Sequence, residues 1–188
     1  MFNQLAMPTE QDTTIVMHTN QRSFEDADQA HLQENSRNMI LKLGELAREA
    51  KVEMTVENVG FNYAHSVLFP EDDFIALIKS LPEDIGCLID TGHAILNDWD
   101  LERVIAELGS RISAYHIHNN PGDRDSHRPL FESGMKYSYD QIVSMFRAME
   151  KYSPNADWIL EYSPGPHITP ELMYNDFSEV DSILKSIS

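Results

Sequence analysis

Five short, mainly apolar runs in this sequence each end in a side chain that can bind a metal ion. Longer stretches with helical apolar spacing separate these runs. Such an alternation is typical of βα units whose parallel strands are buried on both faces. The fold is therefore expected to be α/β. The runs cover residues 13–18, 53–59, 86–90, 112–118 and 157–162, and the side chains at their ends are His18, Glu57, Asp90, His116 and Glu161.

The spacing of these five side chains separates two α/β architectures. They follow one another at intervals of 39, 33, 26 and 45 residues, close to the roughly 31 residues per unit of a (β/α)8 barrel. In a barrel the carboxyl ends of all strands converge on one rim, whereas a doubly wound sheet brings ligands together only where its strand order reverses. The pattern therefore favours part of a barrel with one metal centre.

Start and stop signals delimit the helices between the strands. The sequence predicts helices over 26–50, from Pro70 to before Pro82, over 99–108, from the N-cap Ser138, and from Thr169-Pro170 onward. The first of these is the longest, and its apolar stripe is expected to face the core. This stripe consists of Leu32, Met39, Ile40, Leu43, Leu46, Ala47 and Ala50.

The side chains at the strand ends form a mixed oxygen and nitrogen donor set. Such a set suits Mn, Co, Mg, Fe or Zn, and it leaves the identity of the divalent metal open. The single cysteine, Cys87, excludes a cysteine-based zinc site and an internal disulfide framework. The expected cofactor is therefore one divalent metal ion or more.

Three further candidates are expected in the loops after the strands. His93 lies three residues beyond Asp90 in the segment DTGH, where it adds a ligand or polarises a substrate carbonyl. Asp125 and His127 stand two residues apart in DRDSH and are placed to chelate a second ion.

Each of these residues also has a purely structural interpretation. Asp90 in Asp-Thr-Gly is equally typical of a turn or a helix cap. His18 fits a turn histidine bonded to backbone, and Glu57 alone fits a surface carboxylate. Each residue alone is a weak signal. The five candidate ligands at five successive strand ends together favour the functional interpretation.

The remaining histidines differ in their spacing. His116 and His118 share one strand face because strand side chains alternate, so one of the two is also interpretable as a buried partner. His65 and His167 match no spacing and are interpreted as exposed loop histidines.

Charge and hydropathy exclude some classes of partner. Fourteen Lys and Arg against 31 Asp and Glu give a net charge of -17, a field that repels nucleic-acid phosphates and anionic lipid. No apolar run approaches the roughly 20 residues of a membrane-spanning helix, and MFNQLAMPTEQ lacks the features of a signal peptide. With one cysteine, the expected compartment is the reducing cytoplasm.

Four segments resemble one known family. VENVG, LIDTGHAIL, YHIHNNPGDRDSHRPL and WILEY occur in the order and spacing of the xylose-isomerase-like barrel superfamily, which holds sugar phosphate isomerase/epimerase proteins and endonuclease IV. The resemblance extends from Thr13 to Ser188. It implies a TIM barrel with a divalent metal at its C-terminal rim and a small sugar or polyol as the substrate.

The resemblance also implies roles for individual residues. Glu57, Asp90, His116 and Glu161 fall on the main metal-binding positions, and His18, Asp125 and His127 on positions that hold additional metals in the endonuclease branch. Glu57, Glu161 and His93 are the implied catalytic residues. His118 and Asn119 are expected to contact the substrate.

Two segments depart from the family pattern. The usual His-Leu-His-Asp-Asn is here His-Ile-His-Asn-Asn at 116–120, which removes one acidic group. The usual Pro-Leu-Gly-Glu-Gly is Pro-Leu-Phe-Glu-Ser at 129–133, without either glycine. Because glycines set the path of a loop, substrate specificity cannot be carried over from the family.

The five strands match the last five of eight. Three βα units, about 90 residues at roughly 31 per unit, are therefore absent before this single domain of residues 1–188. The barrel cannot close from this chain alone, and its two edge strands are hazards for aggregation or dimerisation. The chain is a fragment, forms a homo-oligomer, or is completed by a chain that supplies the missing units.

Three functions follow as hypotheses. The first is a metal-dependent sugar or polyol (phosphate) isomerase/epimerase, in which Glu57 and Glu161 move protons through an enediolate and His93 assists the oxyanion. The second is a zinc-dependent phosphodiesterase that resembles endonuclease IV, although the charge of -17 opposes it. The third is a non-catalytic, truncated barrel subunit.

Overall fold

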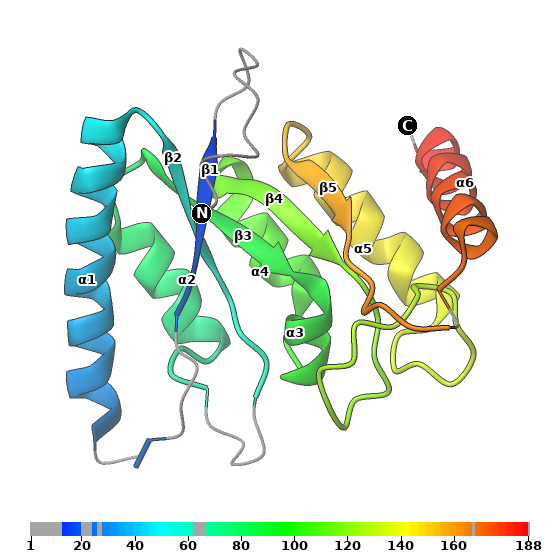
Figure 1. Cartoon of the computed structure of the whole chain (residues 1–188), viewed down its shortest axis with the longest axis horizontal. Helices are drawn as coiled ribbons and strands as arrows, with labels where there is room; N and C mark the ends of the chain where they lie inside the picture. Colours follow the sequence, from blue (N-terminus) through cyan, green and yellow to red (C-terminus); the bar gives the residue numbers. More distant parts are fainter. Residues whose placement is uncertain (1–12, 20–23, 26–27, 62–66, 167, 188) are drawn as a thin grey trace.

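A single parallel sheet with helices along one side forms the frame of the molecule (Figure 1). The computed structural model describes residues 13–19, 24–25, 28–61, 67–166 and 168–187. The strands are β1 (Thr14–His18), β2 (Glu53–Glu57), β3 (Ile85–Asp90), β4 (Ile112–Ile117) and β5 (Asp157–Leu160). The helices are α1 (Gln29–Ala50), α2 (Glu71–Ser80), α3 (Thr91–Leu96), α4 (Leu101–Leu108), the short 3-10 helix η3 (Gly109–Arg111), α5 (Tyr139–Tyr152) and α6 (Pro170–Ile187).

The strand order distinguishes a barrel-type sheet from a doubly wound one. The order is β1-β2-β3-β4-β5, and every neighbouring pair is parallel. A doubly wound sheet reverses its order at a switch point, and this sheet does not. The fold is thus an α/β arc of TIM-barrel type, with five of the eight units of a complete barrel.

One hydrophobic core fills the space between the sheet and the helices. Val56, Ile89 and Tyr115 project from the strands and are fully buried, and they meet Phe74 and Phe146 from the helical layer. Side chains alternate along a strand, so the residues directly after these, Glu57, Asp90 and His116, face the opposite side of the sheet. That side carries the candidate metal ligands at its carboxyl end.

The N-cap predicted at Ser138 is present in the structure. Ser138 and Gln141 form a reciprocal capping box at the start of α5. Gly109, with a φ of 48°, ends α4, where its conformation is unfavourable for residues with a side chain. The predicted helix 99–108 starts two residues later, because Asp100 caps α4 and Trp99 packs on Phe74 at 5.5 Å between ring centroids.

The predicted core face of α1 is only partly correct. Ile40 and Ala47 are buried, but Met39, Leu43 and Leu46 are 51%, 36% and 52% exposed. The helix packs on the sheet through one edge of its apolar stripe.

The two margins of the sheet are open along the part of the chain that the structure describes. No described strand pairs with the outer edge of β1 or of β5. Ile15 and Val16 on β1 and Ile159 on β5 are accordingly between 42% and 49% exposed. Among the described residues, no helix has the length and apolar character needed to cross a membrane.

Candidate metal centre

Four side chains converge where β2, β3, β4 and β5 end. Glu57, Asp90, His116 and Glu161, the primary group, each offer one ligand atom, and all four atoms lie within 4.8 Å of one another. His116 Nδ1 lies 3.1 Å from Glu57 Oε1 and 2.9 Å from Glu161 Oε2. The nearest Asp90 oxygen, Oδ2, is 3.9 Å from the same nitrogen. The structure therefore brings together the four residues that the sequence marked as main ligands.

Backbone geometry explains why these side chains meet. The carboxyl ends of parallel strands share one rim, and Asp90 pairs in register with His116. Asn58, directly after β2, fixes the next strand end, because it donates to the Asp90 carbonyl at 3.0 Å and accepts from the Asp90 N–H at 2.8 Å. Asn58 is 1% exposed, and no sequence motif marks it as a site residue.

The contacts within the primary group favour a protonated His116 and ionised carboxylates at Glu57 and Asp90. Burial would lower the pKa of His116, but its close contacts with the Glu161 and Glu57 carboxylates outweigh burial and raise that pKa to about 10. Burial would raise the pKa of Glu57, yet hydrogen bonds from His116 and His18 hold it below its ordinary value. The fully buried Asp90 carboxyl also keeps a lowered pKa, because the charges of His93 and His118 outweigh burial.

The donor set fits a divalent cation. Three carboxylates and one imidazole are hard and borderline ligands of the kind that Mn, Fe, Co and Zn accept. Glu161 Oε2 is shielded from solvent and makes no hydrogen bond among the described residues, although it faces His116 Nδ1. A buried carboxylate oxygen without a hydrogen bond is unfavourable unless a cation contacts it.

A second group lies beside the first. His93, Asp125 and His127 also offer ligand atoms within 4.8 Å of one another. Asp125 bridges the two rings, with Oδ2 3.0 Å from His93 Nε2 and Oδ1 3.2 Å from His127 Nε2. His127 has a φ of 43°, a conformation that non-glycine residues adopt seldom and mostly at functional sites.

The pKa values of His93 and Asp125 in the second group are also shifted. Burial would lower the pKa of His93, but the charge of Asp90 and contacts with Asp125 raise it to about 9. Burial of its carboxyl group would raise the pKa of Asp125, but hydrogen bonds from His127 and His93 outweigh it and hold that pKa well below its usual range. Asp125 and His127 thus meet as the sequence suggested, with His93 as their third member.

His93 was expected in a loop after β3, but it lies in helix α3. The Asp90 carboxylate accepts the His93 N–H at 2.7 Å and caps this helix, so the Asp-Thr-Gly segment starts a helix instead of a turn. The His93 ring reaches the Asn58 carbonyl with Nδ1 at 2.9 Å. Asp90 consequently serves as both helix cap and candidate ligand.

His18 lies next to the primary group. Its Nε2 atom is 3.0 Å from Glu57 Oε2, and this hydrogen bond is the main cause of its raised pKa. Among the described residues, the close ligand groups that contain Asp125 and His127 do not include His18. Its role as a ligand of an additional metal stays a prediction.

His118 and Asn119 point into the protein. Both are fully buried; the Asn119 amide donates to the carbonyls of Leu130 and Tyr137 at 3.1 and 3.0 Å. These contacts hold the loop after β4. The contact of either side chain with substrate stays a prediction. The two loop histidines of the sequence analysis, His65 and His167, lie outside the described residues.

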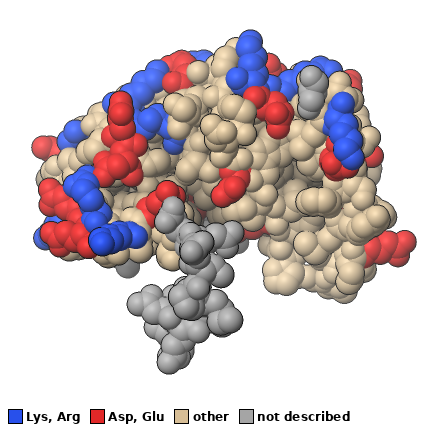
Figure 2. Space-filling view, turned by 90° about the horizontal axis from the view of Figure 1, so that it is seen from above, with Lys and Arg blue, Asp and Glu red and all other residues tan. Residues whose placement is uncertain are grey.

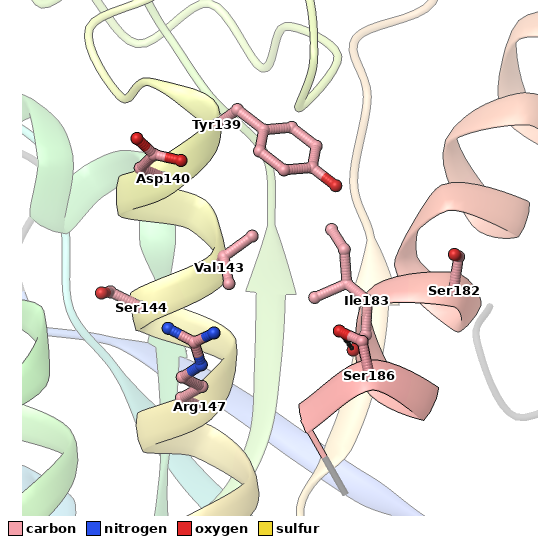
Figure 3. A pocket seen from close by; sticks show the side chains of 8 residues that line it. All are labelled: Tyr139, Asp140, Val143, Ser144, Arg147, Ser182, Ile183 and Ser186. Carbon is pink, nitrogen blue, oxygen red and sulfur yellow. Dashed lines mark hydrogen bonds between the residues drawn. The ribbon is translucent and has the colours of Figure 1, made fainter.

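A groove elsewhere on the molecule lacks this chemistry. It measures about 450 Å³ and runs between α5 and α6 (Figure 3), where Tyr139, Val143 and Arg147 face Ile183 and Ser186. It holds one basic side chain and no histidine. On the face seen in Figure 2, Lys and Arg alternate with Asp and Glu and form no broad basic patch.

Consecutive parallel βα units with candidate metal ligands at the strand ends are typical of an α/β protein of TIM-barrel type. A family model described as xylose isomerase-like TIM barrel matches residues 9–175. The chain belongs to this family. No curated protein matches the chain significantly.

Solved structures agree on the fold. A D-tagatose 3-epimerase-like protein superposes with a TM-score of 0.74 at 14% identity, over 93% of this chain and 63% of its own. A putative xylose isomerase from Rhodospirillum rubrum gives 0.65 at 20% identity, over 94% and 62%. An IolI protein with a bound zinc atom gives 0.60 at 14% identity, over 93% and 61%. The chain thus spans about three-fifths of the length of these structures.

Proposed function

We propose that the primary group holds a divalent metal ion and that the chain belongs to a sugar or polyol (phosphate) isomerase or epimerase. The observation that carries this proposal is the convergence of three carboxylates and one imidazole within 4.8 Å at the strand ends. Epimerases and xylose isomerase-like proteins among the similar structures support it. The metal's identity stays open among Mn, Co, Mg, Fe and Zn, and the single cysteine fits a reducing compartment such as the cytoplasm.

The two glutamates are the proposed proton carriers. A divalent ion at this group would polarise neighbouring carbonyl and hydroxyl oxygens of a substrate and favour an enediolate. Glu57 and Glu161 flank His116 from β2 and from the end of β5, so one takes the proton beside the carbonyl and the other returns it. His93 is placed to assist the oxyanion once its ring exchanges Asp125 for the substrate.

Deuterium exchange tests this function. The metal-loaded protein is incubated with a panel of ketoses and their phosphates in D2O, and deuterium uptake at the carbon beside the carbonyl is measured by mass spectrometry. We expect uptake with at least one substrate and a loss of about 10²- to 10⁴-fold in Glu161→Gln. Glu150→Gln, at an exposed carboxylate of α5, is the matched control. Full exchange in Glu161→Gln would contradict the proposed role.

A phosphodiesterase is the second candidate, and the second group favours it. His93, Asp125 and His127 lie beside the primary group, as a site for more than one metal ion requires. The net charge of -17 and the mixed surface charges oppose binding of nucleic acid. Hydrolysis of bis(p-nitrophenyl) phosphate by the zinc-loaded protein, without any deuterium exchange on sugars, would favour this candidate.

Completion of the barrel is part of the proposal. The chain as one domain supplies five strands, and His18 and Glu161 at the two ends of the site are 39% and 41% exposed. A second copy or a chain with the missing units would cover these ends. A non-catalytic subunit is the third interpretation, favoured if the folded chain binds no metal.

A further inference from the structure

His118 lies directly beneath the proposed metal centre. The residue is fully buried, as is Asp90. Its Nε2 atom is 2.9 Å from Asp90 Oδ1 and 3.0 Å from Asp90 Oδ2. Because a carboxylate can only accept hydrogen bonds, the ring donates its Nε2–H to Asp90.

This donor completes the set of contacts that fixes the Asp90 carboxylate. Oδ1 also accepts the His93 N–H at 2.7 Å. Oδ2 is the oxygen that lies nearer to His116, at 3.9 Å from Nδ1. The His93 N–H holds Oδ1, and the His118 Nε2–H reaches both oxygens, so both carboxylate oxygens are fixed relative to the primary group.

The position of the His118 ring is itself tightly determined. The His118 N–H donates to the Thr91 hydroxyl at 3.1 Å, and this hydroxyl donates back to the His118 carbonyl at 3.0 Å. The ring stacks on His127 at 4.0 Å between centroids with 12° between planes. His118 therefore contacts both the primary and the second group.

Gly92 leaves the space that this ring occupies. A Cβ atom at position 92 would lie 1.9 Å from His118 Cε1 and 2.2 Å from Nδ1. Any side chain there would displace the ring or the helix that begins at Thr91. The glycine of Asp-Thr-Gly is accordingly required by the packing of His118 and not by its backbone conformation.

We propose that His118 is a positioning residue of the metal centre, which orients the Asp90 carboxylate by an Nε2–H hydrogen bond and is kept in place by Gly92. The inference rests on the proposed metal binding by the primary group. It goes beyond that proposal, because it assigns to His118 neither a substrate nor the metal but a neighbouring ligand. Hydrogen-bond donors to ligating carboxylates typically change metal affinity by about 10- to 100-fold.

Cobalt titration of the metal-free protein provides the first test. Co²⁺ affinity, stoichiometry and visible absorption are measured for the wild type, His118→Gln and His118→Leu. Glutamine keeps an N–H donor at a comparable distance, whereas leucine keeps only volume. We expect about 10- to 100-fold weaker Co²⁺ binding and an altered spectrum in His118→Leu, unchanged stoichiometry, and affinity within a few-fold of wild type in His118→Gln.

The outcomes separate the positioning role from the metal centre itself. A wild type that binds no Co²⁺ would overturn the proposed function. Normal affinity and spectrum in folded His118→Leu would overturn the positioning role and leave the metal centre intact. A loss of one ion per chain, with the affinity of the remaining ion unchanged, would make His118 a ligand and would also overturn it.

A double-mutant cycle keeps the inference testable if His118→Leu does not fold. Gly92→Ala should weaken Co²⁺ binding as the loss of His118 does, because its methyl group occupies the space of the ring. In a His118→Ala background the same change should cost little more, since the ring is gone. Additive losses in affinity would show that Gly92 acts independently of His118 and would contradict the proposal.

Discussion

At the scale of single residues, the candidate site depends on groups that hold the ligands as much as on the ligands. Asn58 bonds to the N–H and to the carbonyl of Asp90, and His93 reaches the Asn58 carbonyl. These bonds are buried, so the backbone groups would have no access to water if Asn58 were truncated. The ends of β2 and β3 are therefore fixed by one amide side chain.

Replacement of Asn58 should consequently be costly. Asn58→Ala leaves one buried N–H and one buried carbonyl without their partner, and we expect a loss of about 2–4 kcal/mol in the free energy of unfolding. Urea denaturation followed by circular dichroism measures this loss. Asn38→Ala, at an exposed position of α1, should change stability by less than about 0.5 kcal/mol. Equal effects of the two substitutions would contradict the role given to Asn58.

The ligands were predictable from the sequence, but their supports were not. Glu57, Asp90 and His116 end their strands, and strand periodicity alone places them on one rim. The contacts of Asn58 with Asp90 and of His118 with Asp90 depend on distances between strands, which no local pattern records. The contact of His118 with substrate stays a prediction. The full burial of this side chain was not predictable, because alternation gives the face of a side chain but not its depth.

At the scale of elements, residues that share one helical apolar period can differ in burial. The apolar stripe of α1 reads as one core face, yet only Ile40 and Ala47 reach the sheet, and Leu43 stays exposed. Helix α3 was missed because six residues are too few for a periodic signal. Its cap, Asp90, was interpreted as a metal ligand, with a turn or a helix cap as the structural alternative.

Two substitutions in α1 test this difference. Ile40→Ala should lower the free energy of unfolding by about 2–4 kcal/mol, because a fully buried side chain leaves a cavity. Leu43→Ala should cost less than about 1 kcal/mol, since that side chain is already 36% exposed. Thermal or urea unfolding of both variants measures the contrast. A large cost for Leu43→Ala would show that another surface covers this side of α1.

The buried Cys87 thiol on β3 affects the pH dependence of stability and provides a test of burial. Burial raises the pKa of the Cys87 thiol to about 12, while an unfolded cysteine ionises near 8.5. The contribution of this thiol to stability is therefore complete below about pH 8.5 and falls as pH rises toward 12. We expect native protein at pH 8 to resist a thiol reagent such as DTNB and urea-unfolded protein to react fully. Rapid labelling of the native protein would contradict the burial of β3.

At the scale of the whole molecule, the arc is open at both margins. Ile159 on β5 and Tyr174 and Phe177 on α6 are 44%, 71% and 66% exposed, and Ile15 and Val16 are exposed on β1. Exposed apolar residues beside unpaired strand edges promote association. The number of strands was predictable from the spacing of the ligands, whereas what covers these margins depends on a surface outside the described residues.

Association should therefore depend on these margins. We expect the average mass in sedimentation velocity to rise with protein concentration, because two strand edges and their apolar neighbours are accessible. A lysine on an edge strand opposes pairing, so Ile159→Lys should shift the distribution toward the monomer. Lys185→Gln, on an exposed part of α6, is a control for the change of charge. A wild type that is monomeric at all concentrations would contradict this expectation.

The central claim is that the strand ends form one metal centre, and metal content tests it most directly. The folded protein is reconstituted with Mn, Co, Fe or Zn, freed of excess metal, and measured by elemental analysis together with its mass in solution. The account predicts one or more ions per chain in the wild type and in Glu150→Gln, and loss of that metal in Asp90→Asn and Glu57→Ala with unchanged helix content. A folded wild type without bound metal, or full retention in Asp90→Asn, would contradict it.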